Sequence, residues 1–84
     1  MRTAVVFWRN VSHAHPGQVK AADIPDTRVV CTAGVVVDED DLTLKLSRDK
    51  AVEKDQWQYA IAIPKALILK SEFFEVEEVA AIGV

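Results

Sequence analysis

Two histidines, His13 and His15, stand one residue apart near the start of the chain. If this segment is extended, residues two apart point to the same side, and both imidazoles can face one ligand. Zinc needs three or four protein ligands, but the chain has no third histidine, so Asp23 or Asp26 would have to complete the site. We therefore expect no metal site, and we interpret the pair as surface side chains that change charge near neutral pH.

The chain has one cysteine, Cys31, which alternates with Val29, Ala33 and Val35. This alternation predicts a strand with an apolar face, so we expect the thiol to be buried in that face and inert. A nucleophilic cysteine would need exposure, a neighbouring base and a lowered pKa. A single cysteine also rules out an internal disulfide, which fits a reducing cytoplasmic setting.

Four consecutive acidic residues, 38–41, resemble a cation site by charge alone. A calcium-binding loop needs spaced oxygen ligands and a glycine at its bend, and this run has neither. We interpret the run as a solvated hairpin turn that discourages pairing with other chains. The glycine-rich phosphate loops and the serine-nucleophile motif are absent as well. We expect neither catalysis nor a cofactor.

Aromatic and basic side chains are the remaining candidates for binding. Exposed rings can stack on bases or a nucleotide, whereas buried rings fill the core. For the two tryptophans, packing within the core is favoured over a role as interface anchors. Together with nearby basic residues and the histidines, they form the set of candidate binding residues: Trp8, Arg9, His13, His15, Lys20, Arg28 and Trp57.

Ten basic and thirteen acidic residues give the chain a net charge of −3. This balance argues against binding nucleic acid through general phosphate neutralisation, although reading a few unpaired bases stays open. No apolar run approaches the roughly 18 residues that span a bilayer, so we expect no membrane partner and a cytoplasmic location. The apolar N-terminal stretch is interrupted at residues 8–10 and is expected to be a strand, not a signal peptide.

The stretch over residues 57–76 organises the predicted fold. Bulky residues alternate with smaller ones over residues 57–63, which predicts a strand with one bulky face. Pro64 ends this strand, because it lacks a backbone N–H and favours a turn. We expect one helical turn over residues 64–68 and then a final strand that includes Phe73 and Phe74.

Three further strands precede that stretch. Residues 3–10 carry apolar side chains on both faces, so the outer face is expected to be covered by the loop at residues 11–26 or by a second subunit. Residues 27–37 form the second strand, with a bend or bulge at Gly34. After the acidic turn, leucines alternate at residues 42, 44 and 46, and residues 48–56 form a charged connection. We predict an all-β domain over residues 1–76, a five-stranded and strongly bent small barrel, followed by an apolar tail at residues 77–84.

With the strands placed, the chain resembles short uncharacterised proteins encoded by phages and prophages, which are similar to the Sm-like and SH3-like (Src-homology-type) small barrels. The resemblance implies a small barrel but no defined activity. The features that carry it are the aromatic opening strand at residues 5–8, the loop ending at Ile24-Pro25, the V-x-T-x-G pattern at residues 30–34, the acidic hairpin at 38–41 and the I-P-K-x-x-I pattern at 63–68.

We therefore expect a non-catalytic binding module that self-associates and docks on a host protein or complex, for example as an inhibitor of a host defence system. Two alternatives stay open. One is an oligomeric protein that sequesters a nucleotide or signalling ligand, with Arg9, Lys20 or Arg28 beside an aromatic wall. The other is an Sm-like nucleic-acid binder, whose affinity should fall steeply with salt.

Overall fold

The computed structural model describes residues 1–11 and 16–78. These residues form five strands and two single-turn 3₁₀ helices, so the all-β prediction is confirmed. In chain order the elements are β1 (Arg2–Asn10), η1 (Ala21–Asp23), β2 (Arg28–Glu39), β3 (Thr43–Lys50), β4 (Trp57–Pro64), η2 (Lys65–Leu67) and β5 (Ile68–Glu75).

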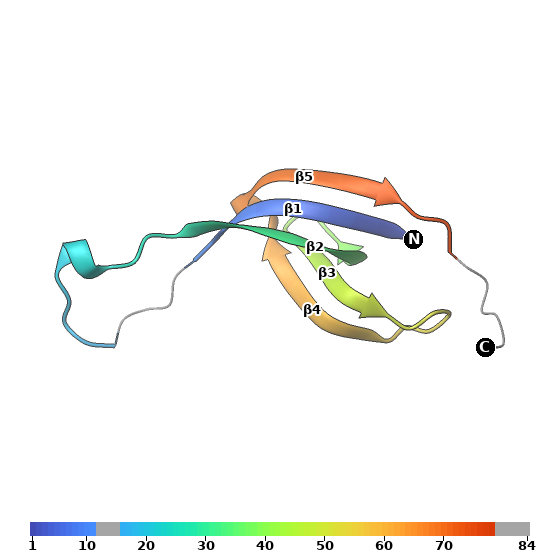
Figure 1. The fold of residues 1–84 in the computed structure, drawn as a ribbon, viewed down its shortest axis with the longest axis horizontal. Helices are drawn as coiled ribbons and strands as arrows, with labels where there is room; N and C mark the ends of the chain where they lie inside the picture. Colours follow the sequence, from blue (N-terminus) through green and yellow to red (C-terminus); the bar gives the residue numbers. More distant parts are fainter. Residues whose placement is uncertain (12–15, 79–84) are drawn as a thin grey trace.

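The strands make one antiparallel sheet in the order β4-β3-β2-β1-β5 (Figure 1). The sheet is strongly bent, so that the β3–β4 hairpin lies beneath β1 and β5 in Figure 1. Among the described strands, β4 and β5 are the two edges and do not pair with each other. The sheet is therefore open, and the predicted closure into a barrel is not confirmed.

The hydrophobic core lies inside the bend and is small. β1 contributes its alternate residues, and β3 and β4 contribute the opposite wall. Burying apolar side chains between the two halves of the sheet is what holds the bend closed. The buried apolar residues are Ala4, Val6, Trp8, Leu44, Leu46 and Ile63, with Val30, Val36, Leu67 and Ile68 packed against them.

The turn between β4 and β5 has the form that the sequence predicts. Pro64 ends β4 with a φ of −61°, and η2 occupies the next three residues. The backbone N–H of Lys65 donates a hydrogen bond of 2.8 Å to the carbonyl oxygen of Leu42. This bond ties the turn to the β2–β3 connection, so η2 is fixed at the same end of the sheet as the acidic hairpin.

The predicted inward face of β2 is wrong, because Cys31 is exposed and not buried. The face turned to the core is the alternate one, which carries Val30 and Thr32. By sequence the outward face of β2 is the more apolar of the two, so alternation alone points to the wrong face, and contacts with the neighbouring strands decide which face packs inward. The indole N–H of Trp8 donates to the Thr32 hydroxyl at 2.9 Å, so the inward face also supplies the acceptor that this buried ring needs.

Gly34 allows β2 and β3 to approach closely. A Cβ atom at this position would lie 2.7 Å from the carbonyl oxygen of Ser47. The predicted irregularity lies further along β2, where the pairing register shifts between Val36 and Asp38. The absence of a side chain at Gly34 therefore allows the close contact between β2 and β3, and the bulge lies further along β2.

Three predictions for the segment from Leu42 to the end of β4 are wrong. Leu42 lies before β3 and is 78% exposed, because the Asp40 carboxylate accepts the backbone N–H groups of Leu42 and Thr43 and holds a turn there. β3 then runs on to Lys50, into the predicted connection. In β4, Tyr59 has a φ of 56° and is 71% exposed, so the predicted bulky face is interrupted.

Candidate interaction surface

The outer face of β2, β1 and β5 lies opposite the core and carries an apolar patch. The pairing register places Val5 between Ala33 and Glu72, and the next row places Phe7 between Cys31 and Lys70. Side chains of directly paired residues share one face of the sheet. We call this surface the outer face, and its apolar members are Val5, Phe7, Val29, Cys31, Ala33, Val35 and Phe74.

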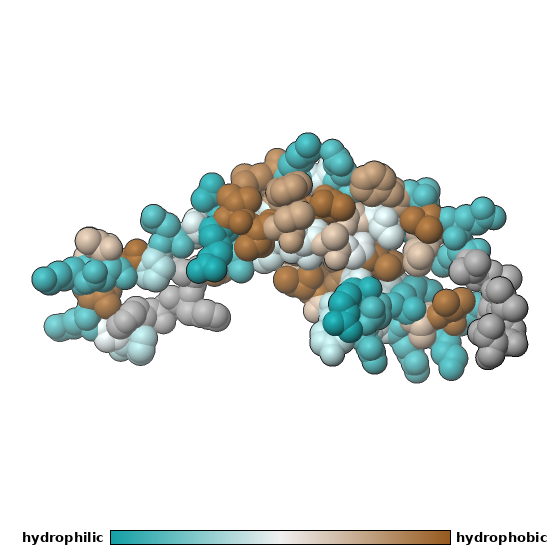
Figure 2. All heavy atoms as spheres, in the orientation of Figure 1, coloured by the Kyte–Doolittle hydropathy of each residue, from teal (hydrophilic) through white to brown (hydrophobic). Residues whose placement is uncertain are grey.

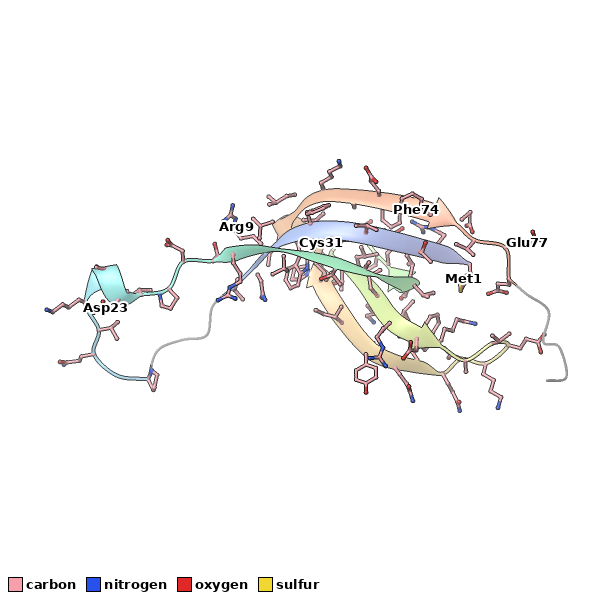
Figure 3. All side chains as sticks on the ribbon, in the orientation of Figure 1. Met1, Arg9, Asp23, Cys31, Phe74 and Glu77 are labelled. Atoms are coloured by element: carbon pink, nitrogen blue, oxygen red, sulfur yellow. The ribbon has the colours of Figure 1, made fainter. Side chains whose placement is uncertain are left out.

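The large members of the outer face are open to solvent. Phe7 is 40% exposed, Val29 is 50% exposed and Phe74 is 48% exposed. Figure 2 shows hydrophobic side chains gathered over the strands at the top of the molecule, and Figure 3 places Cys31 and Phe74 on β2 and β5. Several apolar side chains gathered on one sheet face are typical of an interaction surface, whereas scattered exposed ones are not.

The loop that was expected to cover the outer face does not do so over its described part. Residues 16–26 extend away from the sheet as an arm, and Figure 3 marks Asp23 at its far end. Every described residue of the arm except Val19 is exposed, and η1 buries no side chain. Of the two coverings that the sequence suggests, a second subunit is the one still to be tested.

Charges border the apolar patch along β5. The Lys70 ammonium lies 3.4 Å from the Glu72 carboxylate, and both side chains are more than half exposed. The Arg9 guanidinium donates to the Thr27 hydroxyl at 3.2 Å, near the base of the arm. The cation and the anion on β5 balance, and Arg9 adds one cation beside Val29, so the border carries no large excess of either charge.

A second candidate is the cleft between β5 and the β2–β3 hairpin, with a volume of about 300 Å³. Glu39 accepts from Arg2 at 2.9 Å and pairs with Lys65 at 3.0 Å. Hydrogen bonds from Lys65 and then from Arg2 lower the pKa of Glu39 below its ordinary value. The Arg2 guanidinium also lies 4.5 Å from the centroid of the Phe73 ring. Both oxygens of this carboxylate are occupied, so it suits a structural link better than a proton-transfer role.

A third cluster lies on the β3–β4 hairpin, away from the outer face. The Arg48 guanidinium lies 3.7 Å from the centroid of the Tyr59 ring, and it also binds the Asp49 carboxylate at 2.8 Å. Lys50 lies 5.4 Å from the ring centroid of Trp57. These contacts engage the cations within the chain and stiffen the hairpin.

The structure separates the residues that sequence reasoning grouped as binding candidates. Trp8 is buried, as core packing predicts. Arg9 and Arg28 lie on neighbouring strands near the base of the arm, and Lys20 precedes η1 on the arm itself. Trp57 belongs to β4, at the far edge of the sheet. The two histidine candidates, His13 and His15, lie outside the described residues.

Sequence reasoning missed the charged border of the outer face. Lys70 and Glu72 stand two apart in a run of apolar residues, which is a strand pattern with a charged face. The sequence therefore carried a signal for the charged residues on β5. It did not show which residues of β1 and β2 lie beside them, because that depends on the pairing register between residues far apart in the chain.

Within residues 1–11 and 16–78, no three His, Cys, Asp or Glu side chains are grouped so that they could hold a metal ion. No helix in this described part of the chain has the length and apolar character needed to cross a membrane. Comparisons with protein-family models, with curated proteins and with solved structures found no match.

Proposed function

We propose that the protein is a non-catalytic binding module. It self-associates, and it uses the outer face to dock on another protein. The observation that carries this proposal is the uncovered apolar patch on β2, β1 and β5, which includes Phe7 at 40% exposure. The resemblance to phage and prophage proteins makes a protein of the host cell the proposed partner. The proposal also includes a relationship to the small barrels, which the strongly bent, five-stranded antiparallel sheet supports.

The exposed area of the molecule supports an interaction role. The chain exposes 6695 Å², whereas a compact monomer of 9.3 kDa exposes about 5,000 Å². The difference, about 1,700 Å², is about twice the area of roughly 800 Å² that each partner buries in a standard-size interface. The radius of gyration is 16.7 Å, compared with about 12 Å for a compact chain of this length. An extended arm and an open sheet offer area that a solitary compact domain does not.

The composition of the outer face favours a protein partner over a nucleic acid. Its centre is aliphatic and aromatic, and the charges of Lys70 and Glu72 on its border balance. An apolar centre with a charged rim is the usual arrangement of a protein–protein interface. A surface that binds phosphates would need an excess of cations there.

A matched pair of variants tests this proposal. Phe7→Lys places a charge in the outer face, whereas Leu42→Lys places the same charge on a solvent-exposed turn outside it. The tagged proteins are used to capture partners from host lysate, and the mass of each native assembly is measured in parallel. We expect the Phe7 variant to lose its captured partner and the Leu42 variant to keep it. Equal capture by both variants, together with a strictly monomeric wild type, would overturn the proposal.

A further inference from the structure

The two edges of the sheet differ in how well they are protected. β4 ends at Pro64, which has no backbone N–H, and Tyr59 interrupts its extended backbone with a φ of 56°. Both features discourage the addition of another strand. β5 contains no proline, and its pairing with β1 runs without a break from Lys70 to Glu75. All of its residues after Ile68 are exposed, so the outer edge of β5 is open for pairing.

The sequence of β5 is complementary to itself in the antiparallel direction. The run Leu69-Lys70-Ser71-Glu72-Phe73 has Ser71 at its centre, opposite charges one residue away on each side, and apolar residues beyond them. If two such strands pair about a twofold axis through Ser71, the residue at each position faces the one equally far beyond Ser71 on the partner.

We propose that β5 pairs with β5 of a second copy about a twofold axis at Ser71, forming a continuous sheet of ten strands. This inference rests on the proposed self-association and specifies where it occurs. Lys70 lies opposite the partner's Glu72, and the partner's Lys70 lies opposite Glu72, so the two cross-strand pairs are of opposite charge. Leu69, which is 58% exposed, comes beside the partner's Phe73. A shift of the register by two residues would bring like charges together, so the charges also select the register.

This arrangement leaves the outer face free for the docking partner. Strand addition uses the backbone groups at the edge of β5 and does not cover the centre of the face, where Phe7 and Cys31 lie. The outer faces of the two copies then join along the common sheet. The exposed Cys31 thiol accordingly serves as a probe, because it stays accessible in an edge-paired dimer and is covered in a dimer that stacks outer face on outer face.

Charge reversal and restoration test the inference. Sedimentation equilibrium gives the dimer Kd of the wild type, of Lys70→Glu, of Glu72→Lys and of the double variant. We expect each single variant to weaken the dimer at least about tenfold, because like charges then face each other, and the double variant to recover most of the affinity. Lys54→Glu is the control for Lys70→Glu, because it changes the net charge by the same amount but lies in the β3–β4 connection. Its dimer Kd should match that of the wild type.

Two results would overturn the inference, and they differ in what they leave standing. If the single variants dimerise like the wild type while Phe7→Lys is monomeric and Cys31 is protected from thiol reagents, the self-association is real but uses the outer face. If the wild type is monomeric at every concentration, both this inference and the proposed self-association are wrong. Circular dichroism of each variant confirms that its fold is retained, as expected for side chains that are 66% and 57% exposed.

Discussion

Trp8 joins the core to the hydrogen bonding of the sheet. Its ring is buried, and its indole N–H reaches the Thr32 hydroxyl on the neighbouring strand. A buried N–H without an acceptor carries a desolvation cost, so the residue at position 32 has to be both small and polar. This requirement helps to explain why β2 turns the face with a threonine inward, although its other face is the more apolar of the two.

Thr32→Val keeps the shape of the side chain and removes the acceptor. We expect the free energy of unfolding to fall by about 1–3 kcal/mol, because the indole N–H of Trp8 is left unsatisfied. Urea denaturation measures the change. In a Trp8→Phe background the same substitution should cost much less, since no donor remains. An equal cost in both backgrounds would mean that the hydrogen bond does not contribute.

Glu39 gives the protein a defined acid sensitivity. Hydrogen bonds from Lys65 and Arg2 lower its pKa in the folded protein below the ordinary value of 4.5. The unfolded state therefore takes up this proton first as the pH falls. The stability due to the ionised carboxylate is complete above about pH 4.5 and is lost as the pH falls through the folded-state pKa.

The Glu39→Gln variant tests this pH dependence. At pH 7 it should be less stable than the wild type by about 0.5–1 kcal/mol, the size expected for a partly exposed ion-pair network. The difference should shrink steadily below about pH 4.5, as the wild type loses its carboxylate charge. Urea unfolding at pH 7 and at acid pH gives the two values. A difference that stays constant with pH would contradict the role assigned to this carboxylate.

At the scale of the elements, β2 and β3 approach each other closely. The backbone at Gly34 lies against the Ser47 carbonyl group, and Ser47 itself is buried. The Ser47 hydroxyl lies 2.7 Å from the backbone carbonyl oxygen of Asp49 on β3 and 2.7 Å from that of Gln58 on β4. These contacts connect three neighbouring strands, β2, β3 and β4.

Gly34→Ala should destabilise the protein, although alanine is the better strand residue by intrinsic preference. The added Cβ would lie 2.7 Å from a backbone oxygen, which cannot move without shifting β3. We expect a loss of about 1–3 kcal/mol in the free energy of unfolding, as in other overpacked sites. Ala33→Ser, at the exposed neighbouring position, should change it by less than about 0.5 kcal/mol. If Gly34→Ala proves neutral or stabilising, the close approach is not a constraint.

At the scale of the whole molecule, the core is small for the surface that the chain exposes. Within residues 1–11 and 16–78 six apolar side chains are buried, and the arm adds area without adding to this core. Small domains with little core often rely on association for part of their stability. The open edge of β5 and the uncovered outer face are the two surfaces where association would add it.

Self-association predicts a melting temperature that depends on protein concentration. A partner that binds only the folded chain stabilises it by mass action, so raising the concentration about a hundredfold should raise Tm by several degrees. Scanning calorimetry over that range measures the effect. Lys70→Glu should lose most of the dependence, whereas Lys54→Glu should retain it. A Tm independent of concentration in the wild type would indicate a monomer.

Local patterns in the sequence were enough to predict five strands, the end of β4 at Pro64 and the single turn before β5. These features depend on side-chain alternation and on the missing N–H of proline, which act over a few residues. The same patterns wrongly placed Leu42 within a strand and Tyr59 on an unbroken bulky face, because a side-chain cap and a positive φ override alternation locally.

The tertiary structure alone decided which face of β2 packs inward, that the sheet stays open between β4 and β5, and that the Cys31 thiol is exposed. An alternating pattern defines two faces of a strand, but in β2 the more apolar face is not the one that is covered. That choice depends on contacts between residues distant in the chain, such as Trp8 with Thr32 and Gly34 with Ser47. The candidate surface is made by the same long-range register, so only the folded sheet brings its residues together.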